Sequence, residues 1–385
     1  MMKKKIVILG STGSIGKSLL KIIKKDKQNF EIKLLSAKSN YKELLKQAKL
    51  FNVKNIIITD KKSFQIASKI RLYKNINIYN NFKELKKILN TKVDYTMSSI
   101  IGLDGLKPTI DLIKYTKKIA IANKESIVCG WSLIEKELIK NNTKFLPVDS
   151  EHFSIWFALK DIKISEVEKI YITASGGPFL NVPLSKLKNI KISQALKHPN
   201  WKMGKKITID SSTMMNKVFE IIEARNIFSI PYNKLDILTH PKSYMHAIIK
   251  FNNGLIKTVL HETTMEIPIQ NTLYDNKKFF YKSKKVDLNI LNNLDLKKIN
   301  FDKFPLVKII KKLPIRNSLF ETILVAANDR FVELYLNGRI KYADISNKLL
   351  KFINNKEFDK FKRIKPKKIE NILNLNKYVR LKIKL

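Results

Sequence analysis

The sequence is poor in cysteine and in long apolar runs. Its 385 residues include one cysteine, Cys129, which excludes an internal disulfide and fits a reducing cytosol. No segment approaches the ~20 apolar residues of a membrane-spanning helix. The apolar run after the basic N-terminus, residues 6–9, is shorter than the ~7 to 15 residues of a signal-peptide core. We therefore expect a soluble, cytoplasmic protein that does not bind a membrane.

Arginine is scarce although the chain is strongly basic. It carries 75 Lys and Arg against 33 Asp and Glu, a net charge of +42, and seven of the basic residues are Arg while 68 are Lys. The lysines are spread along the whole chain. Surfaces that bind nucleic acid favour Arg and cluster their charge. We therefore expect no specific nucleic-acid partner, although polyanions should bind non-specifically at low salt.

The first part of the chain alternates short β-branched runs with amphipathic stretches, which is typical of a parallel sheet covered by helices. A hydrophobic content of 44% allows two or three domains with buried cores. The expected strands are 5–9, 32–36, 55–58, 93–97, 118–122 and 144–148. The expected helices are 16–25, 41–49, 82–89 and 125–140.

Later segments have a different pattern. Strands are expected at 169–173, 234–238, 245–251 and 255–261, with one strong helix at 213–228 and further helices at 319–337, 342–354 and 367–375. The last two of these strands flank Asn-Asn-Gly, which is typical of a hairpin. The fold class is α/β, with a Rossmann-like parallel-sheet domain, an α+β domain and a C-terminal helical domain. The expected boundaries are 1–149, 150–279, a linker at 280–304, and 305–385.

The stretch "ILGSTGSIGKSLL" places Gly10, Gly13 and Gly16 between a strand and a helix. Glycines at this point let a pyrophosphate approach the helix N-terminus. The spacing is G-x-x-G-x-x-G, so an ordinary glycine turn is the alternative. After the second strand, "SAKSNYK" has no acid before Glu43 to hold a ribose 2′-hydroxyl. Lys38 suits a 2′-phosphate instead, which favours NADPH, unless it is one more lysine of a lysine-rich chain.

The stretch "FLPVDSEHF" (145–153) contains the first of the five histidines, which all lie between residues 152 and 261. If the strand before it stays extended, Asp149 and Glu151 point to the same side and Ser150 points away. A divalent cation is the usual partner of two neighbouring carboxylates. The alternative is a polar loop at a strand end.

A second candidate segment is "TIDSSTMMNKVFEIIEARNIF". Its hydroxyl residues, Ser211 to Thr213, predict a helix start with amides that can bind an anion. The following helix is apolar on most sides, except for a stripe of Asn216, Glu220 and Glu223 with Lys217 beside it. One glutamate could complete an oxygen-only site for Mg²⁺ or Mn²⁺. The spacing does not choose between them.

Two loops complete the set of candidate motifs. "SGGPF" (175–179) follows a strand and could cradle a phosphate or form a simple turn. "HPNWKMG" (198–204) combines His, Trp and Met without a strand or helix period. We interpret it as a lid that closes over a ligand, with a tryptophan packed in the core as the alternative.

Taken together, these segments resemble the 1-deoxy-D-xylulose 5-phosphate reductoisomerase family of the methylerythritol phosphate route to isoprenoids. The matching stretches are "GSTGSIG", "ANKES", "LPVDSEH", "SGGPF", "HPNWKMG", "IDSSTMMNK", "IEAR" and "HPKSYMH", in family order. The resemblance implies an NADPH domain, a metal-containing catalytic domain with a lid, a helical C-terminal domain and a homodimer. It also implies that Glu220, rather than Glu223, is the third metal ligand.

The resemblance assigns the remaining roles. One Mg²⁺ or Mn²⁺ per subunit would be held by Asp149, Glu151 and Glu220. The substrate phosphate would be held by Ser175, His198, Ser211, Asn216 and Lys217, the reacting carbons would face Lys124, Ser150 and Glu151, and the lid would carry Trp201 and Met203. The candidate cofactor contacts are Thr12, Gly13, Ser14, Ile15, Ala37, Lys38, Asn40, Asn123, Glu125 and Gly204.

The chain departs from the family pattern after His261, where "HETTMEIPIQ" keeps Pro268 but lacks the expected Asp and Arg. Ser212 stands where the family more often has Ala. Three alternatives stay open at this point. They are another NADP-dependent reductase on the same sheet, which would not need the three carboxylates, a basic nucleic-acid-binding protein, and an inactive homologue.

Overall fold

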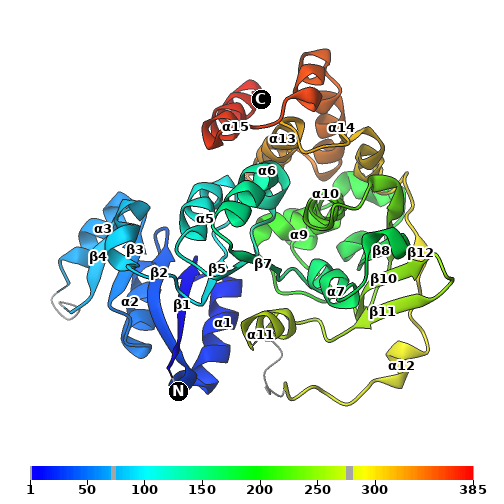
Figure 1. Ribbon diagram of the computed structural model, residues 1–385. Helices are drawn as coiled ribbons and strands as arrows, with labels where there is room; N and C mark the ends of the chain where they lie inside the picture. The colour runs from blue at the N-terminus through cyan, green and yellow to red at the C-terminus, as the bar shows by residue number, and fades with distance from the viewer. Residues whose placement is uncertain (1, 71–74, 275–280, 385) are drawn as a thin grey trace. The chain divides into compact units, whose positions relative to one another are not determined.

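The structure is a computed structural model that describes residues 2–70, 75–274 and 281–384 (Figure 1). The chain divides into two compact units. Unit 1 comprises Met1–Ser126, Leu133–Asp149 and Met265–Tyr281, and unit 2 comprises Ile127–Ser132, Ser150–Thr264 and Lys282–Leu385. Within the described ranges, no helix combines the length and the apolar character that crossing a membrane requires.

The described part of unit 1 contains a seven-stranded sheet with the strand order β4-β3-β2-β1-β5-β6-β7. Its pairings are parallel, so the carboxyl ends of these strands share one edge. The winding reverses between β1 and β5, the point at which doubly wound sheets bind ligands. The strands are β1 (Lys4–Leu9), β2 (Phe30–Ala37), β3 (Asn55–Ile58), β4 (Asn77–Tyr79), β5 (Tyr95–Ser98), β6 (Lys118–Ile121) and β7 (Lys144–Pro147).

Helices cover this sheet because each connection between parallel strands must cross over it. A cluster of buried side chains, including Val7, Leu34 and Leu112, packs between strands and helices. The helices are α1 (Ser14–Lys25), α2 (Tyr41–Leu50), α3 (Lys61–Ser68), α4 (Leu85–Ile88), α5 (Leu106–Ile113), α6 (Lys124–Lys140) and α11 (Glu266–Tyr274). The middle of α6, Ile127–Ser132, groups with unit 2.

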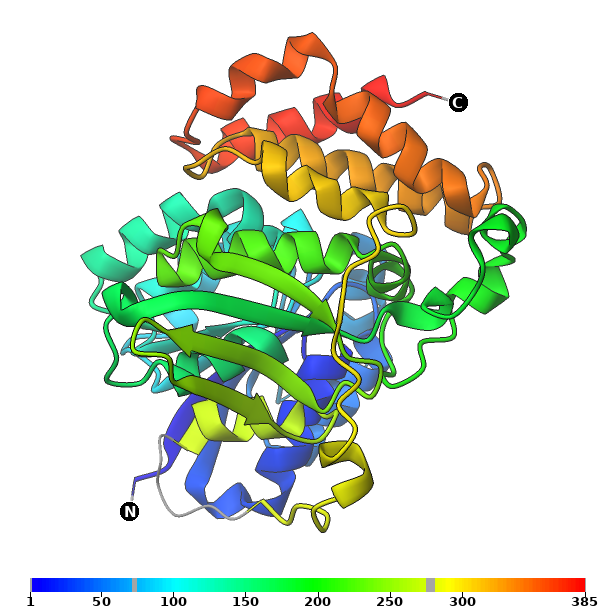
Figure 2. The ribbon, with the colours of Figure 1, turned by 90° about the vertical axis from the view of Figure 1, so that its right-hand side faces the viewer.

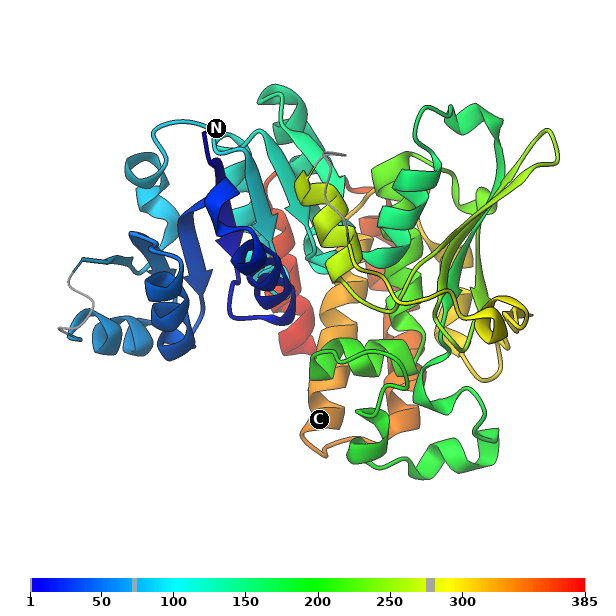
Figure 3. The ribbon, with the colours of Figure 1, turned by 90° about the horizontal axis from the view of Figure 1, so that it is seen from below.

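Unit 2 contains a mixed sheet with the strand order β11-β10-β8-β9-β12. β8 and β9 are parallel, and the other pairings are antiparallel. The predicted hairpin is present, and Figure 3 shows it in yellow-green; Gly254 takes a φ of +85° in its turn. The strands are β8 (Val167–Ala174), β9 (Leu235–Thr239), β10 (Met245–Phe251), β11 (Ile256–Leu260) and β12 (Lys297–Lys298).

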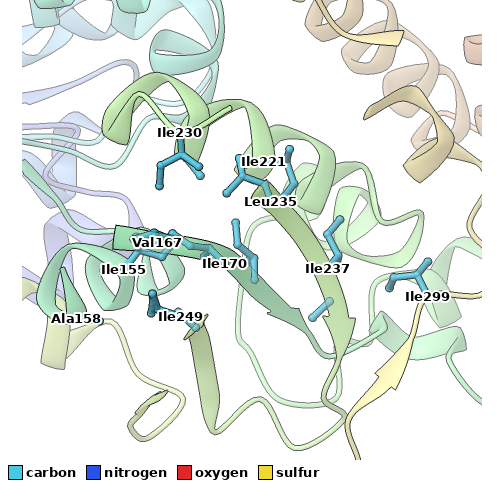
Figure 4. Packing of buried hydrophobic residues seen from close by; sticks show 14 of the residues in the cluster. Ile155, Ala158, Val167, Ile170, Ile221, Ile230, Leu235, Ile237, Ile249 and Ile299 are labelled. Carbon is cyan, nitrogen blue, oxygen red and sulfur yellow. The ribbon is translucent and has the colours of Figure 1, made fainter. Parts of the chain in front are cut away.

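The helices of unit 2 include some that pack against this sheet, while those nearest the C-terminus pack on one another (Figure 2). They are α7 (Ser150–Ala158), α8 (Ile192–Ala195), α9 (Lys205–Ser212), α10 (Met215–Phe228), α12 (Leu288–Leu291), α13 (Phe320–Leu336), α14 (Tyr342–Ile353) and α15 (Ile369–Lys382). Figure 4 shows the core that holds α10 on the sheet, where Ile221 meets Ile170 and Ile237. This core fixes which side of α10 stays available for polar residues.

The α/β fold class is confirmed, and the compact units differ from the predicted domains in two places. Helix α11 belongs to unit 1, since Tyr274 donates to Asp26 (2.9 Å) and Thr272 bonds Tyr95 (3.1 Å); the sequence had placed it in 150–279. The expected linker 280–304 contains α12 and β12, and β12 pairs with β9. The boundary between 279 and 280 lies outside the described residues. The division into functional domains stays a prediction.

The core of unit 2 should dominate its stability. Ile249 is fully buried at the centre of β10, whereas Ile315 is 86% exposed. We expect Ile249→Ala to lower the free energy of unfolding by about 2–5 kcal/mol. The control, Ile315→Ala, should change it by less than about 0.5 kcal/mol. Urea unfolding of both variants measures the difference, and equal losses would contradict this assignment of the core.

Candidate active site

The glycine loop after β1 is shaped for a close backbone approach. Gly10 has a φ of +73°, and a Cβ there would lie 2.6 Å from the carbonyl oxygen of Ser99. The amide of Gly10 donates to Ser36 Oγ (3.1 Å), and the amide of Ser11 donates to the Ser36 carbonyl (2.9 Å). Helix α1 follows at once, and no side chain among the described residues caps it. The backbone amides at its N-terminus therefore face the loop, as an anion site requires.

The candidate cofactor residues of unit 1 share the carboxyl edge of the sheet. Thr12 to Ile15 follow β1, Ala37 ends β2, and Asn123 and Glu125 follow β6. Asn123 caps α6 by accepting from the Ser126 amide (2.6 Å) and donates to the Gly102 carbonyl (2.7 Å). It thus ties the loops after β5 and β6 together.

Lys38 and Asn40, the two candidate cofactor residues after β2, make different contacts. Asn40 caps α2 by accepting from the Glu43 amide (3.4 Å). Lys38 is exposed and pairs with Asp104, with an Nζ to Oδ2 distance of 3.1 Å. A pair between exposed charges stabilises little, so Lys38 can turn to a phosphate at low cost. Gly204 lies in unit 2, immediately before α9.

Sequence reasoning missed one residue that supports the glycine loop. Gln47, buried on α2, accepts from Ser11 Oγ (2.8 Å) and donates to the Ser11 carbonyl (3.3 Å). A polar residue on the buried face of α2 was the only indication of this role.

Lys124 and Asp149 form an ion pair in unit 1. Lys124 is the first residue of α6, and Asp149 follows β7 by two residues. Both side chains are largely buried, at 11% and 23% exposure. Asp149 ends its segment of unit 1, and the chain passes directly into Ser150 and Glu151.

The expected extended conformation at 149–151 is wrong. Ser150 begins α7, so Glu151 lies in the first helical turn. The side chain of Ser150 donates to Glu151 Oε2 (2.6 Å). A serine at a strand end followed by an acid is typical of a helix start, and the high hydrophobicity of 153–158 concealed the helical period.

At the centre of unit 2, the Lys217 ammonium lies between the carboxylates of Glu151 and Glu220. Its distance to Glu220 Oε2 is 2.5 Å, and one oxygen of each glutamate lies within 4.8 Å of the other. The lysine and both acids are at least 88% buried at their side chains. Burial alone would lower the pKa of Lys217, but the two carboxylates outweigh it and raise the pKa above its ordinary value.

The structure gives Glu220 and Glu223 different partners. Glu220 accepts from Asn216 Nδ2 and from Lys217. Glu223 lies near His152, with 3.9 Å between Nδ1 and Oε2. His152 also bonds the backbone carbonyl of Glu220 through Nε2 (2.9 Å), which fixes α7 against α10. Within unit 2, Glu220 is therefore the glutamate of α10 that shares the Lys217 ammonium with Glu151.

His198 joins two hydroxyls of the predicted phosphate site. Its Nε2 lies 3.1 Å from both Ser175 Oγ and Ser211 Oγ. Its Nδ1 accepts from the amides of Asn200 (3.2 Å) and Trp201 (3.0 Å), which places the proton on Nε2. Burial and the Lys217 charge lower the pKa of His198 to about 4. The neutral Nε2–H group of His198 and the hydroxyls of Ser175 and Ser211 thus lie together.

The sequence predicted that Ser211 and Ser212 begin a helix. In the structure they are instead the last two residues of α9. Met214 follows with a φ of +63°, and α10 starts at Met215. The left-handed residue allows two helices to meet without a linker. Ser211 and Lys217, six positions apart, therefore sit at adjoining helix ends.

Helix α9 is anchored by a buried network that sequence reasoning missed. Asp210 is 2% exposed, pairs with Lys206 (2.8 Å) and accepts from Asn328 Nδ2 of α13 (2.8 Å). Tyr342 of α14 donates to the Ser212 carbonyl (2.7 Å). The C-terminal helices thereby hold the helix that carries Ser211.

The predicted lid residues lie on the loop 198–204. Trp201 is half-buried and makes a T-shaped contact with His246, with 6.3 Å between ring centroids. Met203 is also half-buried, and Gly204 is exposed.

Family models match most of the chain. The model described as 1-deoxy-D-xylulose 5-phosphate reductoisomerase matches residues 6–130, its C-terminal domain model matches 145–228, and the DXP reductoisomerase C-terminal domain model matches 260–382. The chain is 61% identical over 382 residues to the 1-deoxy-D-xylulose 5-phosphate reductoisomerase of Pelagibacter ubique (strain HTCC1062), covering 99% of this chain and 98% of the relative. The chain belongs to the 1-deoxy-D-xylulose 5-phosphate reductoisomerase family.

Other members of the reductoisomerase family agree with this assignment. The relative from Clostridium novyi (strain NT) is 39% identical over 99% of this chain and 98% of its own length. A Zymomonas mobilis reductoisomerase solved with NADPH is 30% identical, with a TM-score of 0.87 over 99% of this chain and 98% of its own. A reductoisomerase solved with NADPH, fosmidomycin and magnesium is 29% identical, with a TM-score of 0.91 over 98% and 97%.

The lowered pKa of His198 predicts a pH-dependent contribution to stability. Between the ordinary pKa of 6.5 and the folded value of about 4, the unfolded chain takes up a proton on this ring that the folded chain does not. The parent should therefore lose stability relative to His198→Asn as the pH falls from 6.5 toward 4, and the difference should be constant above 6.5. Urea unfolding of both proteins at several pH values measures this. A difference that does not change with pH would contradict it.

Proposed function

We propose that the chain converts 1-deoxy-D-xylulose 5-phosphate to 2-C-methyl-D-erythritol 4-phosphate in the non-mevalonate isoprenoid pathway, using NADPH and one divalent cation per subunit. One observation carries the proposal beyond family membership. It is the buried Lys217 between two carboxylates, beside the His198 hydroxyl cluster. This pairs a cation site with an anion site, as a sugar phosphate bound through a metal requires.

Glu151 and Glu220 fit a divalent cation. They already share one positive charge, the Lys217 ammonium, within a buried, oxygen-lined space. Asp149, two residues before Glu151, is proposed as the third ligand, and the oxygen-only set favours Mg²⁺ or Mn²⁺. When bound, the cation supplies Lewis-acid polarisation of the substrate's ketone and hydroxyl oxygens. With the cation on the carboxylates, the Lys217 ammonium would pair with the substrate phosphate instead.

The glycine loop of unit 1 fits a dinucleotide. A Cβ at Gly10 would collide with the backbone of Ser99, so the shape of the loop requires glycine there, and the N-terminus of α1, which no side chain among the described residues caps, suits the pyrophosphate. Lys38, which forms an exposed ion pair with Asp104, is proposed to meet the 2′-phosphate of NADPH. NADPH supplies the hydride that reduces the rearranged aldehyde.

The phosphate end of the substrate is proposed to bind Ser175, His198, Ser211, Asn216 and Lys217. His198 is neutral near pH 7, so its Nε2–H orients the ligand while Lys217 provides the charge. Binding energy from a phosphate remote from the reacting carbons can be used to orient those carbons.

Lys124 and Ser150 are proposed to face the reacting carbons together with Glu151. Lys124 is held by Asp149, so its ammonium is positioned before the substrate arrives. The loop with Trp201 and Met203 is proposed to close over the substrate and to exclude water from the aldehyde.

A homodimer is the expected assembly. Strand β11 forms an outer edge of the unit 2 sheet; its first residue, Ile256, is 62% exposed, and Leu255 just before it is 66% exposed. Edge strands present unpaired backbone groups that can join a second sheet. This edge is proposed as part of the contact between two copies.

Turnover assays with matched glutamate variants test the proposed function. NADPH oxidation with 1-deoxy-D-xylulose 5-phosphate should require Mg²⁺ or Mn²⁺ and stop with chelator. Glu220→Gln should lower kcat by at least about 100-fold, because an anchoring oxygen of the cation site is lost. Glu223→Gln, the control on the same helix, should stay within about 10-fold of the parent. Metal-independent turnover would indicate another NADP-dependent reductase instead.

The glycine loop offers a second test. Gly10→Ala adds both a left-handed strain and a backbone clash, whereas Gly102→Ala, at a φ of +71° with open space, adds the strain alone. We expect Gly10→Ala to weaken NADPH binding by at least about 10-fold more than Gly102→Ala. Isothermal titration with NADPH compares them. Equal affinities would show that the loop does not receive the cofactor.

A further inference from the structure

Two of the central histidines lie outside the proposed catalytic set and stack on each other. His246 of β10 and His261, just after β11, have ring centroids 3.7 Å apart and planes 14° apart. They are 2% and 9% exposed. The hairpin brings them together, since Met245 pairs with Leu260 in its register. Both rings therefore belong to the interior of unit 2.

Backbone carbonyls fix the two rings in place. His246 Nε2–H donates to the carbonyl of His261 (3.2 Å), and His261 Nδ1–H donates to the carbonyl of Glu262 (2.8 Å). The remaining nitrogen of His261, Nε2, is buried without a hydrogen-bond partner among the described residues. Leaving a buried polar atom unpaired costs stability. A hydrogen bond of Nε2 therefore does not account for a histidine at this position, whereas the face of the ring contacts His246.

The pair forms the middle of an aromatic column. Phe153 meets His261 edge to face, with centroids 6.3 Å apart, and Trp201 meets the other end, His246, at 72°. Such geometry is favourable for aromatic pairs. One end of the column is buried at Phe153 on α7, and the other end is the half-buried tryptophan of the lid loop.

Both imidazoles are neutral near pH 7, which a close stack requires. Burial lowers the pKa of His246 to about 3 and also lowers the pKa of His261. The nearby Glu151 carboxylate acts in the opposite direction on both rings and does not overcome burial. Two neutral rings can stack without repulsion.

We propose that His261 is a positioning residue: its ring stacks on His246 and thereby fixes the orientation of the His246 ring, the seat on which Trp201 docks. His198 anchors the start of the loop 198–204 through its hydrogen bonds, and the contact of Trp201 with His246 holds the loop at its middle. The proposal depends on the proposed function only for the ligand that the loop covers. The contacts of Trp201 with His246 and of His246 with His261 are present in the structure whatever that ligand is.

The alternative is that His261 merely fills space. In that case any residue of similar volume would serve, and the effect of its removal would be confined to stability. A positioning role requires a flat ring, so His261→Phe should rescue what His261→Ala loses. His240 provides the matched control, because it is also buried and bonded to a carbonyl but lies outside the column.

The first readout is the NMR spectrum of the imidazole Cε1–H groups, of which the chain has five. In the parent, the His246 resonance should be displaced by the ring currents of its neighbours, and Trp201→Phe should move it. His261→Ala should also move the Trp201 indole resonance, His261→Phe should restore it, and His240→Ala should leave it in place. This readout needs no turnover, so it is decided even if the proposed reaction is not found.

The second readout is the Michaelis constant. In His261→Ala, KM for 1-deoxy-D-xylulose 5-phosphate should rise about 10-fold, as loss of one aromatic contact implies. His261→Phe should return KM to within about 2-fold of the parent. The proposal is overturned if His261→Ala leaves the Trp201 resonance and KM unchanged. It is equally overturned if His261→Phe, folded, does not restore them.

Discussion

The Lys217 ammonium between Glu151 and Glu220 is the interaction on which the site of unit 2 depends. Each of the three charges would cost several kcal/mol to bury alone, and each is buried only because the others are present. The arrangement therefore constrains α7 and α10 together, with His152 bonding the Glu220 carbonyl as a further tie. If a divalent cation and a phosphate bind here as proposed, the lysine and the two carboxylates would exchange partners.

Helix ends deliver the other groups to this point. Met214 takes a left-handed conformation between α9 and α10, which places Ser211 and Lys217 at two adjoining helix ends. Helix α9 is in turn held by the Asp210 contacts with Lys206 and Asn328. The C-terminal helices thus contribute to the site without supplying a ligand to it.

Much of this could be predicted from the sequence, because strand–helix alternation and residue spacing are local. Strands β3 and β10 have the expected bounds, and the other expected strands differ at their ends. Helix α9 was missed because "KKITIDSS" is rich in β-branched residues with low helix propensity; contacts with α13 and α14 hold it. Helix α7 was missed because it is apolar on most sides, which hides its period.

Side-chain partners were the least predictable part of the site. Spacing on α10 left Glu220 and Glu223 equivalent, and their difference lies in residues of α7 that are distant in sequence. The stack of His246 on His261 likewise depends on hairpin register, although the clustering of histidines indicated where to look. Long-range packing decides such contacts, and one sequence does not encode them in a local pattern.

The most direct test of the account is a crystal structure of the chain grown with Mn²⁺, using the anomalous signal of manganese to locate the ion. The account predicts a single strong peak between Glu151 and Glu220, with Asp149 as the third protein ligand and Lys217 Nζ displaced from the carboxylates. A peak between His152 and Glu223, or a Lys217 that still bridges the two carboxylates beside an ion bound elsewhere, would contradict it.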